Sequence, residues 1–245
     1  MLLLMESPAY QNPLSRVAGG PPAPPPPAGW QHLKMSRRSI ARIVGTALVL
    51  AWALSTAPVG LRVAHADPCP DAQVVFARGT GEPPGVGGAG QAFVDSLTAQ
   101  VPGRSVDVYP VNYPATDDYV NSAKAGAGDA GAHIQNMVAS CPNTKMVLGG
   151  YSQGAAVMDL TTNELPPRVG GHVAAVALFG NPSSTYARQL GADQFPPISP
   201  AYQAKTDAIC VPDDMFCAEG GNMLAHLSYV PDATNQAATF VAGRL

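Results

Sequence analysis

Charged residues are scarce in this chain of 245 residues: they make up 13% of it, against 46% for hydrophobic residues. In the first 66 positions, basic residues outnumber acidic ones. Glu6 is the single acidic residue there, and the basic residues are Arg16, Lys34, Arg37, Arg38, Arg42 and Arg62. The rest of the chain is therefore more acidic than the overall formal charge of −3, and it lacks any Lys/Arg cluster. This absence argues against nucleic acid and anionic membrane surfaces as partners. The apolar content is large enough for a sizeable core.

The basic N-terminal segment is typical of a targeting sequence. A positively charged region begins at Met35-Ser36-Arg37-Arg38, residues 43–54 are apolar, and Ala64-His65-Ala66 forms an A-x-A cleavage site. A membrane anchor is the alternative, but a proline, a glycine and an arginine at 58–62 interrupt the apolar run, which is then too short to span comfortably. We therefore predict a signal peptide at 35–66 and a secreted product without stable membrane insertion.

Residues 1–34 precede this signal and contain a polyproline run at 21–27, which cannot build a core. Because a signal peptide normally starts at the N-terminus, Met35 is a candidate initiator; a short disordered tail is the alternative. The pair Arg37-Arg38 leaves both general and twin-arginine export open. Either way, we predict that 67–245 forms a single domain.

Cysteine is limited to four residues, all after the cleavage site: Cys69, Cys141, Cys210 and Cys217. There is no C-x-x-C motif and few histidines lie nearby, so we expect no metal site and no cofactor. An even number of cysteines in an exported domain indicates disulfides, for which three connectivities are possible. The short spacing favours a local Cys210–Cys217 loop, which leaves Cys69 to pair with Cys141.

Apolar segments of strand length alternate with helical patterns along 67–245, and no internal repeat is present. Strands are predicted at 72–77, 105–111, 145–148, 172–179 and 206–211. Helices are predicted at 91–101, 153–163 and 235–244. A further long helix is predicted to begin at a cap formed by Asp117 and Asp118 and to end at about residue 140. This alternation indicates an α/β fold with a parallel sheet that helices cover on both faces.

The third of these strands leads into the most informative motif of the chain. Gly150-Tyr151-Ser152-Gln153-Gly154 fits the G-x-S-x-G nucleophile elbow, in which a strained turn between a strand and a helix presents a serine hydroxyl. Glycine-rich chains produce this pattern by chance, so the strand before it and the helix after it are what indicate a functional Ser152.

A serine nucleophile needs a base and an orienting acid, which follow it in the order acid, then histidine, in α/β-hydrolases. His133 precedes Ser152 and His172 precedes a predicted core strand, so both are interpreted as surface or capping residues. His226 is the histidine that fits the base. Several acids lie before it, and Asp213 and Asp214 are favoured because the disulfide loop would hold them rigidly. Spacing alone does not separate these two.

The oxyanion of an acyl-transfer intermediate needs preorganised donors. The backbone N–H of Gln153, next after the nucleophile, is one candidate, and Thr80 in the loop after the first strand is the other. The same loop contains Gly85-Val86-Gly87-Gly88-Ala89-Gly90, which matches G-x-G-x-x-G. A dinucleotide site would need its first glycine directly after the strand, but Glu82-Pro83-Pro84 intervenes, so we reject this reading.

Taken together, these motifs resemble the cutinases, and more closely the secreted cutinase-like esterases of mycobacteria. The resemblance covers essentially all of 67–245 and rests on four segments: Phe76–Thr80, Gly150–Gly154, Cys210–Cys217 and His226–Tyr229. It implies an α/β-hydrolase three-layer sandwich around a mainly parallel five-stranded sheet, without a lid. It also implies that the acid is Asp214, that Thr80 and Gln153 form the oxyanion hole, and that the disulfides are Cys69–Cys141 and Cys210–Cys217.

The resemblance further implies a secreted, monomeric serine esterase that hydrolyses short- to medium-chain acyl esters, lipids or cutin-like polyesters through Ser152, His226 and Asp214. Leu224, Leu227 and residues 198–202 are expected to form apolar walls for the acyl chain. The alternative is a secreted binding or cell-envelope protein with little activity on the same fold, because a fold does not determine a function. The intact set of three residues favours the enzyme.

Overall fold

The computed structural model describes residues 69–245. The predicted proline-rich extension at 1–34 and the signal peptide at 35–66 lie outside the described residues. Within the part that is described, no helix is both long and apolar enough to cross a membrane.

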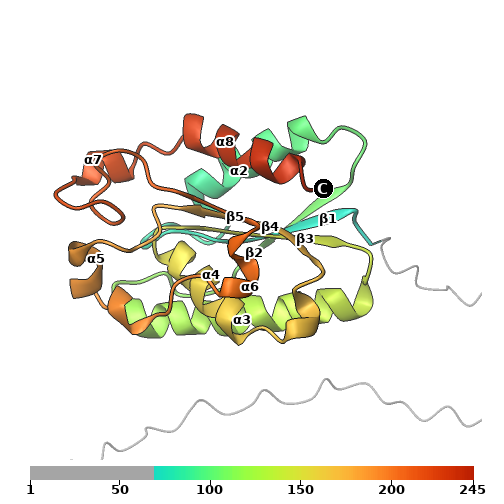
Figure 1. The fold of residues 1–245 in the computed structure, drawn as a ribbon, viewed down its shortest axis with the longest axis horizontal. Coiled ribbons are helices and arrows are strands. Elements are labelled where there is room, and N and C mark those ends of the chain that lie inside the picture. The colour runs from blue at the N-terminus through green and yellow to red at the C-terminus, as the bar shows by residue number, and fades with distance from the viewer. Residues whose placement is uncertain (1–68) are drawn as a thin grey trace, which may run out of the picture. The chain divides into compact units, whose positions relative to one another are not determined.

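A single five-stranded parallel sheet forms the centre of the domain (Figure 1). Its spatial order is β2-β1-β3-β4-β5, and the strands are β1 (Ala72–Ala77), β2 (Val106–Pro110), β3 (Lys145–Tyr151), β4 (Val173–Phe179) and β5 (Thr206–Ile209). The strand order reverses between β1 and β3, because β2 returns to one side of β1 and all later strands add to the other. In open parallel sheets such a switch point is where the loops at the carboxyl ends leave room for a binding site.

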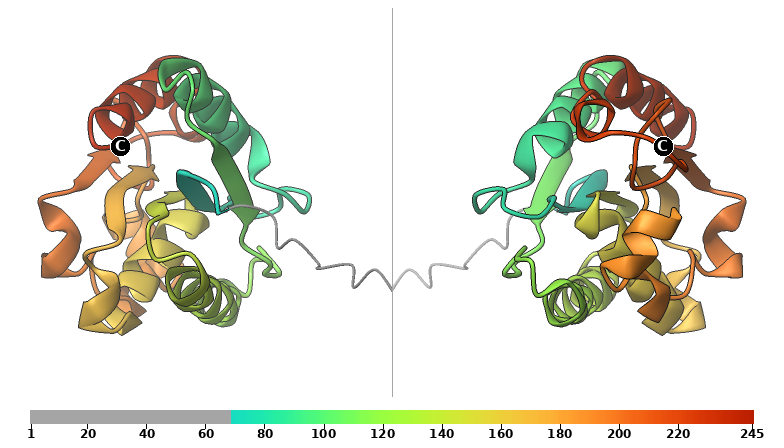
Figure 2. Two further views of the ribbon diagram at one scale, coloured as in Figure 1. Left: turned by 90° about the vertical axis from the view of Figure 1, so that its right-hand side faces the viewer. Right: turned by 90° about the vertical axis from the view of Figure 1, so that its left-hand side faces the viewer.

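Helices cover both faces of this sheet, as the α/β pattern predicts (Figures 1 and 2). One face carries α2 (Gly87–Gln100) and α8 (Asp232–Ala242), and the other carries α3 (Tyr119–Ser140) and α4 (Gln153–Glu164). Shorter helices are α5 (Thr185–Gln189), α6 (Pro200–Gln203) and α7 (Met223–His226), with 3₁₀ turns at Pro167–Val169 and Ala192–Gln194. The predicted three-layer α/β arrangement is therefore confirmed.

The core forms one apolar cluster on each face of the sheet. Beneath α2 and α8, the rings of Phe76, Phe93 and Phe179 lie with their centroids 5.8–6.2 Å apart, at the tilted and edge-on angles that aromatic pairs prefer. The opposite cluster includes Met146, Leu148, Met158 and Ile134. All six residues of β1 are buried, so both faces of this strand are covered.

The boundaries differ from the predictions in informative places. Helix α2 begins at Gly87, four residues earlier than predicted, and β3 continues through two glycines to Tyr151 because they pair with β4. Asp118 occupies the N-cap position of α3, but its carboxylate accepts from the side chain of Asn121 and caps no backbone N–H. The prediction of an aspartate cap is therefore wrong in its chemistry, though right in its position.

Candidate active site

Ser152 lies at the turn between β3 and α4, with φ of 55° and ψ of −120°. This left-handed backbone is strained for a residue with a side chain, and such strain concentrates at functional sites. A Cβ on Gly150 would lie 2.1 Å from the carbonyl oxygen of Gly154, and one on Gly154 would lie 1.9 Å from that of Ala77. Both glycines of the G-x-S-x-G motif are therefore required by close backbone approach.

His226 lies within hydrogen-bond distance of this serine: its Nε2 is 2.9 Å from the Ser152 Oγ. The histidine ends the short helix α7, whose N-terminus is capped by the Asn222 side chain accepting from Ala225 N–H. Its imidazole is buried between the rings of Tyr151 and Phe216, whose centroids lie 5.0 and 4.1 Å away. The Tyr151 hydroxyl also donates to the His226 carbonyl. The ring is thereby held in one orientation.

Asp214 completes the chain of contacts, because its Oδ2 lies 2.8 Å from the His226 Nδ1. The carboxylate is fully buried, and Oδ1 accepts from the backbone N–H of Phe216. Burial alone would raise the pKa of Asp214, but hydrogen bonds from His226, Tyr229 and Phe216 outweigh it and hold the pKa below its usual value. The neighbouring Asp213 is exposed, so the structure brings Asp214 to the histidine.

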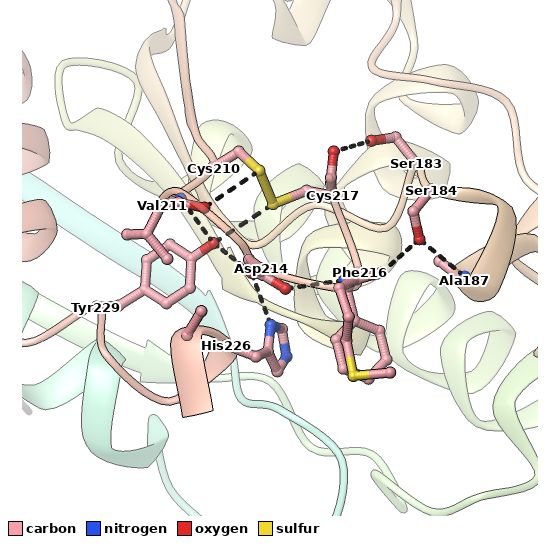
Figure 3. The surroundings of a disulfide bond; sticks show 12 residues. Ser183, Ser184, Ala187, Cys210, Val211, Asp214, Phe216, Cys217, His226 and Tyr229 are labelled. Atoms are coloured by element: carbon pink, nitrogen blue, oxygen red, sulfur yellow. Dashed lines mark hydrogen bonds and ion pairs between the residues drawn. A yellow bond between two sulfur atoms is a disulfide. The ribbon is translucent and has the colours of Figure 1, made fainter. Parts of the chain in front are cut away.

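The loop that carries Asp214 is closed by the Cys210–Cys217 disulfide (Figure 3). It is also tied to the segment before α5: the Ser184 hydroxyl donates to the Met215 carbonyl, and the backbone N–H groups of Ser183 and Ser184 donate to the Phe216 carbonyl. The second disulfide joins Cys69 to Cys141. Both predicted pairings are confirmed.

Thr80 and Gln153 come from two different segments that adjoin the nucleophile. Gln153 is the first residue of α4 and follows Ser152 directly. Thr80, in the loop after β1, lines the cavity that Ser152 also lines. The Gln153 side chain is buried and bonded to the α3 region, where its Oε1 accepts from the Ser122 hydroxyl and its Nε2 donates to the Thr116 carbonyl. The α4 N-terminus beside Ser152 is therefore anchored by a side chain, and its dipole favours negative charge there.

The Thr80 loop is stabilised by an internal carboxylate. Glu82 accepts from the Gly79 N–H at 2.6 Å and from the Gly88 N–H, at the start of α2, at 2.7 Å. The Arg78 guanidinium donates to the carbonyls of Glu82 and Tyr113. Glu82 thus fills the helix terminus where a dinucleotide phosphate would have to bind, which is a structural reason to reject the G-x-G-x-x-G reading.

A cavity of about 510 Å³ opens beside Ser152. One wall consists of Thr80, Glu82, Asp117, Tyr119, Tyr151 and Ser152, and the other of Tyr186, Leu190, Phe216, Met223, His226 and Leu227. Leu227 lines the cavity, as predicted, but two other predictions for its apolar walls are wrong. Leu224 does not line the cavity and is 80% exposed, and residues 198–202 lie elsewhere, with Tyr202 buried in the core cluster next to α3 and α4.

The remaining histidines of the described region lie away from this cavity. His133 is half-buried on α3, where its ring stacks on Tyr109 and its Nε2 lies 2.7 Å from the Gln73 Oε1. Burial lowers the pKa of His133. His172 precedes β4, and its carbonyl accepts from the Met146 N–H. Among residues 69–245, no group of three or more His, Cys, Asp or Glu side chains is arranged to hold a metal ion.

The parallel sheet, the strained serine at its switch point and the adjoining histidine and aspartate define the class of α/β serine hydrolases. The cutinase family model matches residues 68–245, so the chain belongs to the cutinase family. The predicted family and the predicted class of carboxylic ester hydrolase are thereby confirmed.

Named relatives agree with this assignment. The chain is 59% identical to carboxylesterase Culp1 of Mycobacterium tuberculosis, over 86% of this chain and 98% of that protein. It is 46% identical to phospholipase Culp4 of the same organism, over 91% and 99%. Among solved structures, the cutinase of Trichoderma reesei in complex with a phosphonate inhibitor matches with a TM-score of 0.61 and 36% identity, covering 72% of this chain and 77% of that one.

Proposed function

We propose that this protein hydrolyses carboxylic esters by forming an acyl-enzyme on Ser152. The observation that carries the proposal is the continuous pair of contacts from the Ser152 Oγ to His226 and from His226 to Asp214, at 2.9 and 2.8 Å. A hydroxyl becomes an effective nucleophile when an adjacent base takes its proton and a carboxylate stabilises the resulting imidazolium.

In the proposed mechanism, the Ser152 hydroxyl attacks the ester carbonyl while His226 Nε2 takes its proton. His226 then donates this proton to the departing alcohol, and in the second half of the cycle it activates the water that releases the acid. Thr80 and the backbone N–H of Gln153 donate to the tetrahedral oxyanion. The α4 dipole and the anchored side chain of Gln153 support this assignment, because donors that are already oriented need no reorganisation during the reaction.

The substrates proposed are short- to medium-chain acyl esters, including those of lipids. An apolar wall suits an acyl chain, and the large hydrophobic side chains exposed in the described domain lie in or next to the segments that form this wall: Tyr186, Leu190, Met223, Leu224, Leu227 and Val230. Exposed apolar groups gathered at one place indicate contact with an apolar partner or substrate. The phospholipase name of one relative adds support for lipid esters.

We further propose that the protein acts as a secreted monomer. Disulfides persist in oxidising compartments, and both cystines of the domain accord with export by the signal peptide predicted at 35–66. Analytical ultracentrifugation of the secreted protein and N-terminal sequencing of its mature form test these two points. A dimer, or a mature chain that begins well before residue 67, would contradict them.

The decisive test is turnover of p-nitrophenyl esters of increasing acyl length by the wild type, Ser152→Ala and Ser96→Ala. Ser96 is a matched control, because it lies on α2 outside the cavity. We expect Ser152→Ala to lower kcat/KM by at least about 10³-fold and Ser96→Ala to leave it unchanged. Activity retained by Ser152→Ala would refute the acyl-enzyme and favour the alternative of a binding protein. A maximum at long chains would refute the proposed substrate range.

A further inference from the structure

The carboxylate of Asp214 has a second side-chain partner that the Ser-His-Asp arrangement does not use. The Tyr229 hydroxyl lies 2.6 Å from Asp214 Oδ2, the same oxygen that faces His226 Nδ1 (Figure 3). Tyr229 follows α7 by three residues and is 1% exposed, so its hydroxyl is removed from water. A buried hydroxyl on a buried carboxylate is a strong contact, because both groups lose solvent and have few other partners.

The direction of this hydrogen bond follows from the neighbouring atoms. The Tyr229 oxygen also lies 3.6 Å from Cys217 Sγ and 3.4 Å from the Val211 nitrogen. Cys217 forms a disulfide and has no proton to give, while the backbone nitrogen of Val211 is a donor. The single phenolic proton is therefore directed to the ionised Asp214, which can only accept. Asp214 Oδ2 thus accepts two hydrogen bonds, from the phenol and from the imidazole.

The Tyr229 ring is fixed by packing as well. It meets the rings of Phe179, Tyr151 and His226 edge-on, with centroids 6.1, 5.7 and 6.2 Å away. Burial and the adjacent Asp214 raise the pKa of Tyr229, so the phenol keeps its proton. The hydroxyl is consequently a permanent donor, held in place beside the disulfide loop.

We propose that Tyr229 is a positioning residue for the esterase reaction, which orients Asp214 and limits its hold on the His226 proton. The inference rests on the proposed roles of Ser152, His226 and Asp214. A donor on the shared oxygen withdraws negative charge from it, so the carboxylate attracts the imidazole proton less strongly. The same donor, together with the Phe216 N–H on Oδ1, keeps the carboxylate from rotating away from the imidazole.

The pH profile of kcat/KM distinguishes this role from simple packing. In Tyr229→Phe the ring remains and the donor is lost, so the Asp214 oxygen that faces the imidazole keeps more of its negative charge. We expect the acid limb to move up by about 0.5–1 pH unit and kcat at the optimum to fall about tenfold. The other ionisable groups that face the pair, Tyr151 on the imidazole and Glu82 and Asp117 across the cavity, are unchanged in this variant. A purely structural tyrosine would lower activity equally at every pH.

Two further measurements keep the proposal testable. Tyr202→Phe, which removes another buried tyrosine hydroxyl outside the site, should leave the acid limb in place. In an Asp214→Asn background, Tyr229→Phe should cost less than about threefold, because the shared carboxylate is already gone. An equal loss in both backgrounds, or an acid limb that does not move, would overturn the proposal.

If Tyr229→Phe does not fold, a ring-fluorinated tyrosine at position 229 replaces it. Its more acidic phenol is the stronger donor, and the acid limb should then move to lower pH. An unmoved limb would overturn the proposal here too. Failure of this inference leaves Ser152→Ala inactive, whereas failure of the proposed function leaves Ser152→Ala active, so the two outcomes are distinguishable.

Discussion

The two walls of the cavity come from different parts of the chain and differ in chemistry. The first, from residues 80–152, carries the nucleophile, the Thr80 loop and two carboxylates, Glu82 and Asp117. The second, from residues 186–227, carries the histidine and a series of apolar side chains. Both walls are needed for the proposed reaction, because Ser152 lies in one and His226 in the other.

The walls are also held by different forces. The first wall rests on β1, β3 and α4, where regular backbone hydrogen bonds and close glycine contacts leave the backbone little room to move. The second wall consists of short helices and a loop, held by a disulfide and by side-chain hydrogen bonds such as that from Ser184 to Met215. Gly180 is where the second wall approaches the sheet, because a Cβ there would lie 2.9 Å from atoms of both Asp214 and His226. We therefore expect damage to the first wall to cost folding, and damage to the second to cost activity first.

The largest effect is expected from Gly154→Ala. The added Cβ would meet the Ala77 carbonyl at 1.9 Å, and Ala77 is paired with Gly150 of β3, so this backbone cannot move away without disturbing the β1–β3 pairing. We expect a loss of at least about 3–5 kcal/mol in the free energy of unfolding, measured by urea denaturation. Gly128→Ala, at an exposed helical site with no atom within 4 Å, should instead stabilise by about 0.5–1 kcal/mol. Equal effects of the two would contradict a backbone role for Gly154.

The two disulfides offer a direct test of the comparison. Replacing Cys69 and Cys141 by serine opens a closure of 72 residues, which the chain-entropy model values at about 4 kcal/mol, with little change in kcat/KM. Replacing Cys210 and Cys217 opens a closure of 7 residues, worth about 2–3 kcal/mol. We expect this second change to lower kcat/KM about 10- to 100-fold, because it loosens the Asp214 loop. Thermal melts and ester assays on both variants measure the contrast, and the reverse order of activity losses would refute it.

The difference between the walls also explains what was predictable from sequence. The elbow around Ser152 is contiguous, and its glycines are needed by local geometry, so the motif and its flanking elements were predictable. Spacing alone did not separate Asp213 from Asp214, because both lie in one loop, and only the resemblance to the cutinases favoured Asp214. In the structure, the Asp213 backbone forms a turn with positive φ that bonds to Asn222, and Asp214 is the residue buried behind it.

Most of the apolar wall was missed for a related reason. Helices α5 and α7 have five and four residues, too few to display a helical period. Tyr186 packs edge-on against Phe216 at the cavity, and Ser184 ties its segment to the loop that carries Asp214. Contacts between segments about 30 residues apart leave no local pattern. Tyr229 belongs to the segment His226–Tyr229 that the sequence singles out, but its hydrogen bond to Asp214 is likewise a tertiary contact without a local pattern.

A third prediction concerns Asp159, which lies on α4 and accepts from Asn181, the residue after Gly180. It therefore joins the nucleophile helix to the strand end beneath the second wall. Burial raises the pKa of this carboxyl to about 7 from 3.8, so the folded protein keeps the proton over a pH range in which the unfolded chain loses it. Stability from this group is accordingly full below pH 4 and falls as the pH rises from about 4 to about 7.

Asp159→Asn removes this titration while keeping the shape of the side chain. The stability of the variant relative to the wild type should rise by up to about 4 kcal/mol between pH 4 and pH 8, measured by urea denaturation at several pH values. The comparison is between two proteins at each pH, so other titrating groups cancel. A difference that stays constant over this range would show that Asp159 titrates alike in the folded and unfolded states.

The smallest effect tests the charge of the first wall. Asp117 and Glu82 line the cavity, and none of the residues that line it is a lysine or arginine. An ester with a carboxylate at the end of its acyl chain should therefore be disfavoured relative to a neutral ester of equal length. Asp117→Asn should raise the ratio of kcat/KM for the anionic ester to that for the neutral one by about two- to threefold at low salt, and less in 0.5 M salt because of screening.

Asp118→Asn is the matched control, since Asp118 is also exposed at the start of α3 but bonds Asn121 and does not line the cavity. It removes the same charge one residue away, so it should change the ratio less than Asp117→Asn does. If both variants raise the ratio equally, the discrimination comes from the general negative charge of the domain. If only Asp117→Asn does, the first wall selects substrates by charge while the second selects them by chain length, and the two walls differ in specificity as well as in how they are held.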